Sequence, residues 1–294
     1  MSKKILITGA SGGFGKLTVK TLLEQGHHVA ASMRNVDGKN KANAEELKAA
    51  GASIVEIDVT NNDSVNNGVQ GAIAALGGLD VVINNAGVGV LGLQEQFTPE
   101  DFQRLFDINV FGIQRVNRAA LPHLRGQGSG LLIHVSSLLG RMTMPFYGPY
   151  NASKWAVEAI AENYRTELSG FGIDSTLVEP GGYPTTFFDS LIRPSDHSQD
   201  DSYGEMVQAP HQMFESFEGA LASNPAQNPQ DVADAIAGLV ATPAGQRPFR
   251  TVVDKMGMGD HIKPYNESLE QITSGIYNAF GMGDMLELKV PQKQ

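Results

Sequence analysis

The stretch TGASGGFG, residues 8–15, joins a short apolar segment to a segment of helical period near the start of the chain. Gly9 permits a tight turn, Gly13 permits close approach of a ligand to the backbone, and Gly15 permits close packing of the helix on a sheet. The first amides of such a helix are unpaired and attract phosphate. A glycine-rich turn alone can be an ordinary connection. At the first turn of an alternating chain, it predicts a dinucleotide site.

Apolar segments of strand length alternate with longer amphipathic segments along most of the chain. This alternation indicates right-handed β-α-β units and a sheet buried on both faces. The predicted fold class is α/β: a doubly wound, mostly parallel sheet of the Rossmann type with helices on both faces, in one domain over residues 1–294. Strands are expected at 4–8, 28–33, 53–58, 80–84, 131–137, 174–179 and 249–254, and helices near 14–25, 40–50, 62–76, 100–124 and 150–169.

The composition is that of a globular protein, and it excludes several classes of function. The 294 residues carry a net charge of −10 without a long basic run, which argues against nucleic acid or an anionic membrane as partner. The chain has no cysteine, so disulfides and thiolate metal sites are excluded and a reducing compartment fits. No apolar stretch approaches about 18 residues. We expect a cytoplasmic protein.

The seven histidines show no metal-ligand spacing. We expect no catalytic metal, because the chemistry that the tyrosine–lysine pair described below indicates needs none. His134 falls inside a predicted strand, where a hydrogen-bonded core residue is expected.

The end of the second predicted strand bears on the choice of dinucleotide. An acidic side chain there would accept hydrogen bonds from a free ribose 2′-hydroxyl. This chain has Met33 followed by Arg34, and a guanidinium can pair with a 2′-phosphate. The sequence thus favours NADP(H) over NAD(H), the alternative being a solvated arginine.

Two segments depart from the alternating pattern. The polar stretch RPSDHSQDDSYGE, residues 193–205, follows the sixth predicted strand and has apolar residues on both sides. Ligands of such sheets bind at this edge, so we expect a substrate lid at about 183–225, the alternative being a plain surface insertion. A C-terminal extension at about 262–294 lies beyond the recognisable motifs.

Two tyrosines, Tyr147 and Tyr150, precede a lysine in the stretch YGPYNASK. Pro149 suits the first position of a helix, so Tyr150 and Lys154 share one face a turn apart. A free phenol titrates near pH 10, and bringing its pKa to about 7 takes about 4 kcal/mol. One ammonium group in a partly desolvated cleft supplies energy of that order. Tyr150 is therefore the candidate proton donor, the alternative being an exposed tyrosine–lysine pair.

Seven motifs occur in the order and spacing typical of the short-chain dehydrogenase/reductase family, in its shorter single-domain branch. They cover about residues 4–187: TGASGGFG, DVT (58–60), NNAG (84–87), INVFG (108–112), VSS (135–137), YNASK (150–154) and EPGGYPT (179–185). The resemblance implies a homo-oligomeric, nicotinamide-dependent oxidoreductase, as a homodimer or homotetramer.

The resemblance also implies roles for individual residues. Its spacing selects Ser137 over Ser136 as the group that orients the substrate oxygen, and it gives Lys154 a hydrogen bond to the nicotinamide ribose. Asn109 is similar to the fourth family member, which helps hold a water in a proton path; an asparagine tolerated in a helix is the alternative. The implied cofactor-binding residues are Gly9, Ser11, Gly13, Phe14, Gly15, Arg34, Asp58, Val59, Asn85, Ala86, Gly87, Tyr150, Lys154, Pro180 and Thr185.

These observations predict an NADP(H)-dependent reductase acting on a small-molecule carbonyl, or the reverse alcohol dehydrogenase. An apolar ketone or aldehyde is expected, because apolar side chains flank the motifs. Two alternatives remain: a non-catalytic NADP(H)-binding redox sensor, and an epimerase or dehydratase acting on a nucleotide sugar. The side chains expected to line the pocket are Met142, Met144, Phe146, Tyr147, Tyr183, Phe187 and Phe188.

Overall fold

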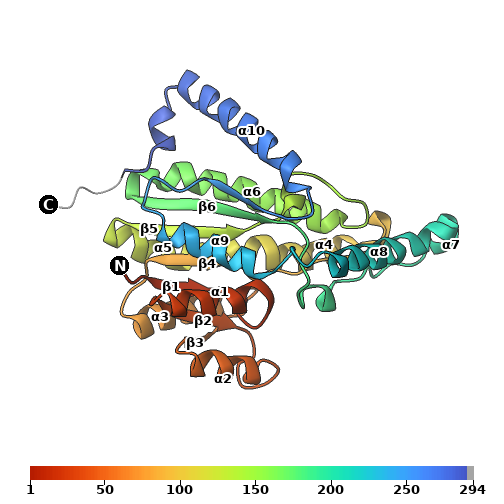
Figure 1. Ribbon diagram of the computed structural model, residues 1–294, viewed down its shortest axis with the longest axis horizontal. Helices are drawn as coiled ribbons and strands as arrows, with labels where there is room; N and C mark the ends of the chain where they lie inside the picture. Colours follow the sequence, from red (N-terminus) through yellow and green to blue (C-terminus); the bar gives the residue numbers. More distant parts are fainter. Residues whose placement is uncertain (290–294) are drawn as a thin grey trace.

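The computed structural model describes residues 1–289, and these form a single parallel sheet with helices on both faces (Figure 1). Within this range seven strands lie in the order β3-β2-β1-β4-β5-β6-β7. The fold class predicted from the sequence is confirmed. The strands are β1 (Lys4–Ile7), β2 (His28–Met33), β3 (Ser53–Glu56), β4 (Val81–Asn84), β5 (Gly130–Val135), β6 (Ile173–Pro180) and β7 (Arg250–Val253).

The strand order reverses between β1 and β4, which pair directly although β2 and β3 separate them in sequence. Because all the strands are parallel, their carboxyl ends lie at one edge of the sheet. A ligand crevice forms at that edge where the order reverses. The turns after β1, β4, β5 and β6 therefore lie together, and they carry most of the candidate residues.

Side chains alternate along each strand and feed two hydrophobic cores. Ile5 and Ile7 of β1 belong to one core, and Leu6 between them belongs to the other. Helices α1 (Gly13–Glu24), α2 (Lys41–Ala49) and α9 (Gln230–Ala241) contribute to the first core. Helices α3 (Asn62–Leu76), α5 (Gly112–Gln127) and α6 (Gly148–Leu168) contribute to the second.

The helix predicted at residues 100–124 consists of three pieces. Helix α4 (Pro99–Phe106) leads into a π-helical segment, η2 (Asp107–Phe111), and then into α5. Thr98 caps α4 by accepting a hydrogen bond from the Asp101 amide, and the Asp101 carboxylate accepts one from the Thr98 amide. π-helical turns are frequent at functional sites, and this one contains Asn109.

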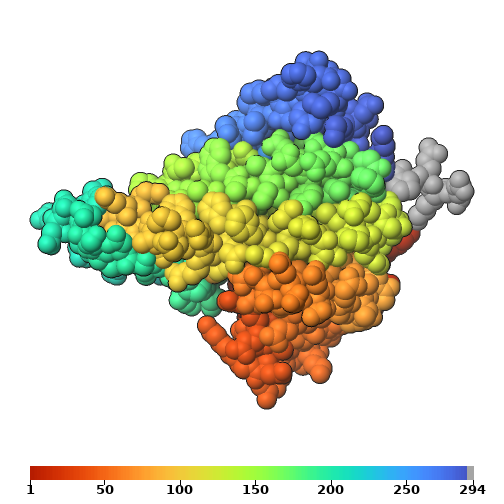
Figure 2. Space-filling view, turned by 180° about the vertical axis from the view of Figure 1, so that it is seen from behind, coloured from red at the N-terminus to blue at the C-terminus, as the bar shows by residue number. Residues whose placement is uncertain are grey.

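The segment at about 183–225, named the lid segment below, contains η5 (Phe188–Ser190), α7 (Asp200–Tyr203), η6 (Gly204–Gln208) and α8 (Ala209–Ser223). Ile192 forms an isolated parallel bridge with Val90, in the loop after β4. Ser195 donates hydrogen bonds from its amide and its hydroxyl to Asp101, at 3.0 and 2.7 Å. The lid segment protrudes from the body beside the residues near 90–105 (Figure 2).

Helix α10 (Gly259–Ala279) follows β7 and rises away from the sheet on the side of α6 (Figure 1). The short turns η1 (Gln94–Gln96), η3 (Leu138–Gly140), η4 (Ser169–Phe171) and η7 (Gly283–Leu286) complete the elements. The last part of the C-terminal extension, residues 290–294, lies outside the described residues. No helix within residues 1–289 has the length and apolar character needed to cross a membrane.

Candidate active site

The glycine loop after β1 has the backbone geometry of an anion site. Gly9 and Gly13 have φ values of +69° and +50°, which side chains rarely adopt. A methyl group on Gly15 would lie 2.3 Å from the Gly9 carbonyl oxygen, so helix α1 needs glycine to approach the strand. Gly12 offers no side chain to cap α1, and the first turn contains no acidic residue. The free amides of this turn suit a phosphate.

The loop after β4 is held against the loop after β1 by hydrogen bonds. The Thr8 hydroxyl accepts from the amides of Asn85 and Ala86, at 3.1 and 3.0 Å. The Asn85 side chain donates to the Thr8 carbonyl at 2.9 Å. Gly87 continues this loop, and a methyl group on it would lie 3.4 Å from the Asn109 side-chain oxygen. Small residues therefore allow the loops after β1 and β4 to approach each other closely at the carboxyl edge of the sheet.

Ser137 follows the end of β5 and begins the turn η3. Its hydroxyl oxygen accepts a hydrogen bond from the Leu139 amide at 3.1 Å. That bond fixes the oxygen and leaves the hydroxyl hydrogen free to be donated. The residue is almost buried, at 8% exposure.

Tyr150 lies in the first turn of α6, which begins at Gly148 with a proline next, as expected. Its ring packs edge-on against Phe187 of the lid segment, with centroids 5.8 Å apart. Burial raises the pKa of the phenol, while a hydrogen bond with the Ser137 side chain acts to lower it. The net direction is opposite to the lowering that we expected from Lys154.

Lys154 lies one turn further along α6, beneath Tyr150. Its ammonium nitrogen lies 5.5 Å from the Tyr150 ring centroid and donates to the Val135 carbonyl at 2.9 Å. Burial lowers the pKa of Lys154 to about 8, and the negative charge of Glu158 acts to raise it. The bond to β5 uses one of three N–H groups and leaves two for a ligand.

Asn109 is almost fully buried, at 1% exposure. Its amide nitrogen donates to the Val88 carbonyl at 2.9 Å and to the Ser153 hydroxyl at 3.2 Å. Its oxygen accepts from the Val88 amide at 2.9 Å. The side chain thus ties the loop after β4 to α6, and its role in a proton path stays a prediction.

Comparison with known proteins gives the family. The model of the family "short chain dehydrogenase" matches residues 3–195. A 3-ketodihydrosphingosine reductase of Bacteroides thetaiotaomicron is 36% identical over 249 residues, which cover 85% of this chain and 87% of the relative. The chain belongs to the short-chain dehydrogenase family.

Two solved structures show how far the likeness extends. A short-chain dehydrogenase from Streptomyces avermitilis has a TM-score of 0.75 and 27% identity, over 96% of this chain and 99% of that one. A 3-ketoacyl-(acyl-carrier-protein) reductase from Brucella melitensis, complexed with NADH, has a TM-score of 0.71 and 26% identity, over 87% of this chain and 98% of that one. The chain is therefore a short-chain dehydrogenase with the oxidoreductase fold of that family.

Three further predicted residues follow the carboxyl ends of β2 and β3. Arg34 is exposed just after β2. Asp58 accepts hydrogen bonds from the Thr60 amide and hydroxyl, at 3.0 and 2.7 Å. Burial acts to raise the pKa of Asp58, but these bonds and the charge of Arg34 outweigh it and hold the pKa low. Val59 is buried, and its carbonyl accepts from Arg115 at 3.0 Å.

Strand β6 ends at Pro180, and the chain then passes beside the glycine loop. The Thr185 hydroxyl accepts from the Phe187 amide at 3.3 Å, and its Cβ lies 3.7 Å from the place of a methyl group on Gly13. Phe14 of the glycine loop packs edge-on against Tyr183, with centroids 5.5 Å apart. Ser11, partly buried, lies in the same loop.

The side chains expected to line the substrate pocket fall into separate groups. Tyr147 and Phe187 pack around Tyr150, and Phe188 packs against Phe187 and two lid phenylalanines, Phe214 and Phe217. Met144 and Phe146 line a cavity of about 720 Å³ along the N-terminal end of α6. Tyr183 is 2% exposed and belongs to a core, and Met142 is half-buried.

His134 is fully buried, as expected of a core residue. Its Nδ1 lies 3.4 Å from the Asn84 amide nitrogen, and its ring stacks on Tyr164. Burial lowers its pKa to about 3, so the ring is neutral. Ser136, expected to be structural, is buried and has no hydrogen-bond partner for its hydroxyl among the described residues.

The sequence reasoning missed a set of buried ions behind Ser137 and Lys154, formed by Arg141, Glu158, Glu179 and Arg250. Two signals could have found it. Glu179 follows Leu177 and Val178 at the end of the strand predicted at 174–179, and Glu158 follows Lys154 by one turn on the same helix face. A carboxylate at either position must be buried and therefore paired. Within the described residues, no group of three or more acidic or histidine side chains could hold a metal.

Proposed function

We propose that this short-chain dehydrogenase is an NADP(H)-dependent carbonyl reductase that also runs in reverse as an alcohol dehydrogenase. The observation that carries the proposal is the meeting of Ser137, Tyr150 and Lys154 at the carboxyl edge of the sheet. They lie beside a glycine loop suited to a phosphate, and the apolar side chains Phe187 and Ile192 of the lid segment pack around Tyr150.

The chain's own residues support each step of that reaction. When bound, the nicotinamide supplies the hydride to a carbonyl carbon or accepts it from an alcohol. The Ser137 hydroxyl hydrogen is not used by the bond from Leu139 and can be donated to the substrate oxygen, which gains negative charge as the carbonyl is reduced. Tyr150 gives the proton to that oxygen, or takes it in the reverse direction.

Lys154 makes this proton transfer possible. Because burial alone raises the pKa of Tyr150, a cation has to stabilise the phenolate. The two N–H groups of Lys154 that are not used by Val135 suit the ribose hydroxyls of the dinucleotide. The same ammonium can therefore hold the cofactor and lower the cost of deprotonating Tyr150.

The choice of NADP(H) rests on Arg34. Its guanidinium is exposed after β2 and makes no ion pair with the described residues, so it is available to a 2′-phosphate. The charge of Arg34 acts on Asp58, but the Asp58 carboxylate accepts its hydrogen bond from Thr60.

The substrate we propose is an apolar ketone or aldehyde. Tyr150 lies in a cluster with Val90, Phe97 and Leu105, and Phe187 and Ile192 of the lid segment pack against it. The similarity to a 3-ketodihydrosphingosine reductase favours a ketone with a long apolar chain. We further propose a cytoplasmic homodimer or homotetramer, consistent with the absence of cysteine and with the family.

The deciding experiment measures NADPH and NADH oxidation against a panel of ketones and aldehydes, including long-chain β-hydroxy ketones. Tyr150→Phe serves as the control. We expect wild-type turnover with NADPH and a loss of about 10²- to 10⁴-fold in kcat for the variant, because it cannot donate the proton. Full activity of a folded, coenzyme-binding Tyr150→Phe protein would exclude this mechanism.

The same panel, extended by nucleotide sugars, separates the alternatives. A redox-sensing regulator would bind NADPH and reduce none of the carbonyls. An epimerase or dehydratase would convert a nucleotide sugar without net coenzyme consumption.

A further inference from the structure

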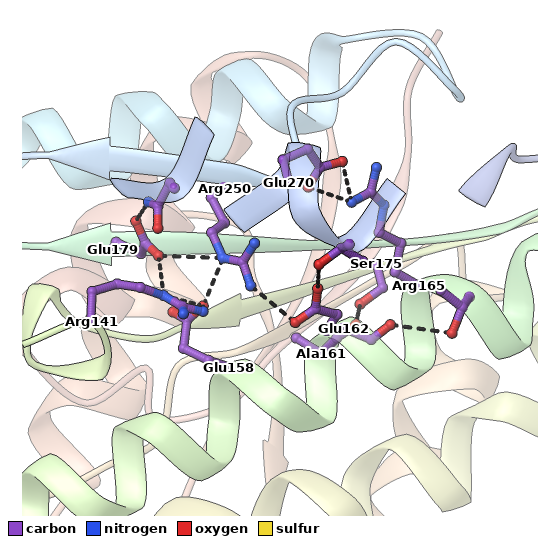
Figure 3. Close-up of polar contacts among 12 residues, drawn as sticks. Arg141, Glu158, Ala161, Glu162, Arg165, Ser175, Glu179, Arg250 and Glu270 are labelled. Carbon is purple, nitrogen blue, oxygen red and sulfur yellow. Dashed lines mark hydrogen bonds and ion pairs between the residues drawn. The ribbon is translucent and has the colours of Figure 1, made fainter. Parts of the chain in front are cut away.

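Behind the proposed catalytic residues lies a set of four buried ions, named the charge cluster below: Arg141, Glu158, Glu179 and Arg250 (Figure 3). Their side chains are 5%, 2%, 0% and 4% exposed. The group brings two arginines together with two glutamates. Burying four ions costs several kcal/mol each before pairing, so stability alone is a weak reason for them.

Glu158 is the centre of the charge cluster. Arg141 donates to one of its oxygens from Nε and Nη2, at 3.1 and 2.5 Å, and Arg250 donates to the same oxygen at 3.0 Å. Glu179 is held less closely, with Arg141 at 3.3 Å and Arg250 at 3.7 Å. Burial and the charge of Glu158 raise the pKa of Glu179. The two arginines are therefore bound chiefly to Glu158.

The charge cluster adjoins two of the proposed catalytic residues. Arg141 follows the turn η3 that Ser137 begins. The preceding residue, Gly140, touches α6: a methyl group there would lie 3.2 Å from the Lys154 carbonyl and 3.1 Å from Cγ of Glu158. The serine-bearing turn is thus pressed onto α6 between Lys154 and Glu158, and the Arg141–Glu158 pair fixes it there.

Helix α10 closes the charge cluster on its outer side. Asn266 donates to Glu179 at 2.5 Å, and the Tyr265 ring centroid lies 5.8 Å from the Arg141 guanidinium carbon. Helix α10 therefore shields the charge cluster from water, and this strengthens the electrostatic interactions among its side chains.

We propose that Glu158 is a positioning residue, which docks the Ser137 turn onto α6 through Arg141 and keeps a negative charge one helical turn from Lys154. The effect of Glu158 on catalysis rests on the proposed function. The positioning itself follows from the contacts of the charge cluster. Glu158 touches neither the reacting atoms nor the cofactor; it acts through Lys154 and the serine turn.

The charge of Glu158 favours the cationic form of Lys154, opposing burial. The other groups that face this region are Tyr150 on the same helix, Arg141 beyond η3, Glu179 on β6, Arg250 on β7 and Asn266 on α10. The two arginines are cations that oppose protonation of Lys154, and their bonds to Glu158 partly screen its field. Removing the Glu158 charge while keeping the arginines should therefore shift the Lys154 titration toward lower pH.

The test uses Glu158→Gln, which keeps the shape of the side chain, beside the matched control Glu162→Gln. Glu162 lies one turn further on the same helix and also bonds Arg250, at 3.3 Å, but it is a quarter exposed and not adjacent to Lys154. A charge-balanced variant, Glu158→Gln with Arg250→Met, leaves the Arg141–Glu179 pair neutral in case the single variant does not fold.

The primary readout is the pH titration of the Lys154 Cε resonance in ¹³C-lysine-labelled protein without coenzyme, assigned by its loss in Lys154→Met. The second readout is the NADPH dissociation constant from pH 6.5 to pH 9. We expect Glu158→Gln to lower the midpoint of the lysine titration and to weaken NADPH binding several-fold at the alkaline end. In Glu162→Gln the lysine titration and the NADPH dissociation constant should match those of the wild type.

Unchanged lysine titration and coenzyme affinity in folded Glu158→Gln and in the balanced variant would overturn the proposal. A shift of equal size in Glu162→Gln would also overturn it, because the effect would then not depend on the contact described. Since the lysine titration needs no substrate, it tests the positioning role of Glu158 even if the wild type reduces no carbonyl. A wild type that reduces no carbonyl would reject the proposed function but not the positioning role of Glu158.

Discussion

At the scale of single residues, the site depends on ionisable groups whose charged forms are disfavoured by burial. Lys154 is the clearest case, because its folded pKa of about 8 lies well below its unfolded value of about 10.4. The folded state therefore disfavours the charge that the proposed reaction uses. Such conflicts between stability and function are typical of active sites.

Lys154→Met should therefore make the protein more stable and inactive. Removing the buried ammonium should raise the free energy of unfolding by about 3 kcal/mol. Leaving the Val135 carbonyl without a donor should lower it by about 1 kcal/mol. The lysine's pKa is lowered on folding, so its penalty is complete below pH 8, shrinks from there to about pH 10.4, and is absent above. Urea unfolding at pH 7 and pH 10.5 measures the difference. A variant that is less stable than wild type at pH 7 would contradict the expectation.

Arg34 sets the expected coenzyme preference. Arg34→Ala should raise the NADPH dissociation constant about 10- to 100-fold, because a charge-assisted contact to the 2′-phosphate is lost. NADH carries no such phosphate, so its affinity should change little. Fluorescence titration with both nucleotides gives the ratio, and Arg125→Ala, an exposed arginine at the end of α5, controls for the loss of one positive charge. Equal weakening of both nucleotides would contradict the role assigned to Arg34.

Single residues also show where sequence reasoning stops. Tyr150 and Lys154 could be paired from the sequence because helical spacing is local. Glu158, Glu179 and Arg250 come from α6, β6 and β7, so only the tertiary fold brings their charges together. The direction of the Tyr150 pKa was missed for the same reason, since its burial depends on Phe187 of the lid segment.

At the scale of elements, the strands were the most predictable parts. All are short, and the five inner strands are mostly buried, so their apolar runs and flanking turns identify them without knowledge of their neighbours. The division of residues 99–127 into α4, a π-helical segment and α5 was not visible. The π-helical segment contains Asn109, whose side chain bonds Val88 and Ser153, and periodicity does not encode such tertiary contacts.

The lid segment is joined to the body by Asp101, which bonds both Ser195 and the cap of α4. Asp101→Ala should loosen the lid segment and speed its cleavage by protease within residues 193–205 several-fold, while Glu100→Ala, an exposed neighbour, should not. Limited proteolysis followed by mass spectrometry measures the rate. If both variants are cleaved at the wild-type rate, the contact does not hold the lid segment.

The same contact has a defined pH dependence. Burial acts to raise the pKa of Asp101, but the bonds from Ser195 and Thr98 outweigh it and hold the pKa below its ordinary value. Its stabilisation is therefore complete above the unfolded pKa of about 3.9 and is lost as pH falls through the lower folded value. The lid segment should accordingly be held at every pH near neutrality, and it should be released only in acid.

At the scale of the whole molecule, helix α10 stands apart from the two cores. Its buried residues are only Gly259, Ile262 and Asn266, and it exposes Ile272 and Ile276, with exposed Phe280 directly after it. The helix is joined to the body by polar contacts, Asn266 to Glu179 and Arg165 to Glu270. This arrangement contributes little apolar burial, but it covers the charge cluster.

Ending the chain after residue 258 should therefore affect function more than stability. Loss of Ile262 burial costs about 2 kcal/mol, and water reaching Glu179 relieves part of its desolvation, so the fold should survive. Water would also screen Glu158 and weaken its hold on Lys154 and on the Ser137 turn, so kcat should fall at least tenfold. Asn266→Ala, which removes only the contact to Glu179, should show a smaller loss in the same direction. Thermal unfolding and steady-state kinetics on the three proteins test this: a shortened chain with wild-type kcat would show that the charge cluster needs no cover from α10.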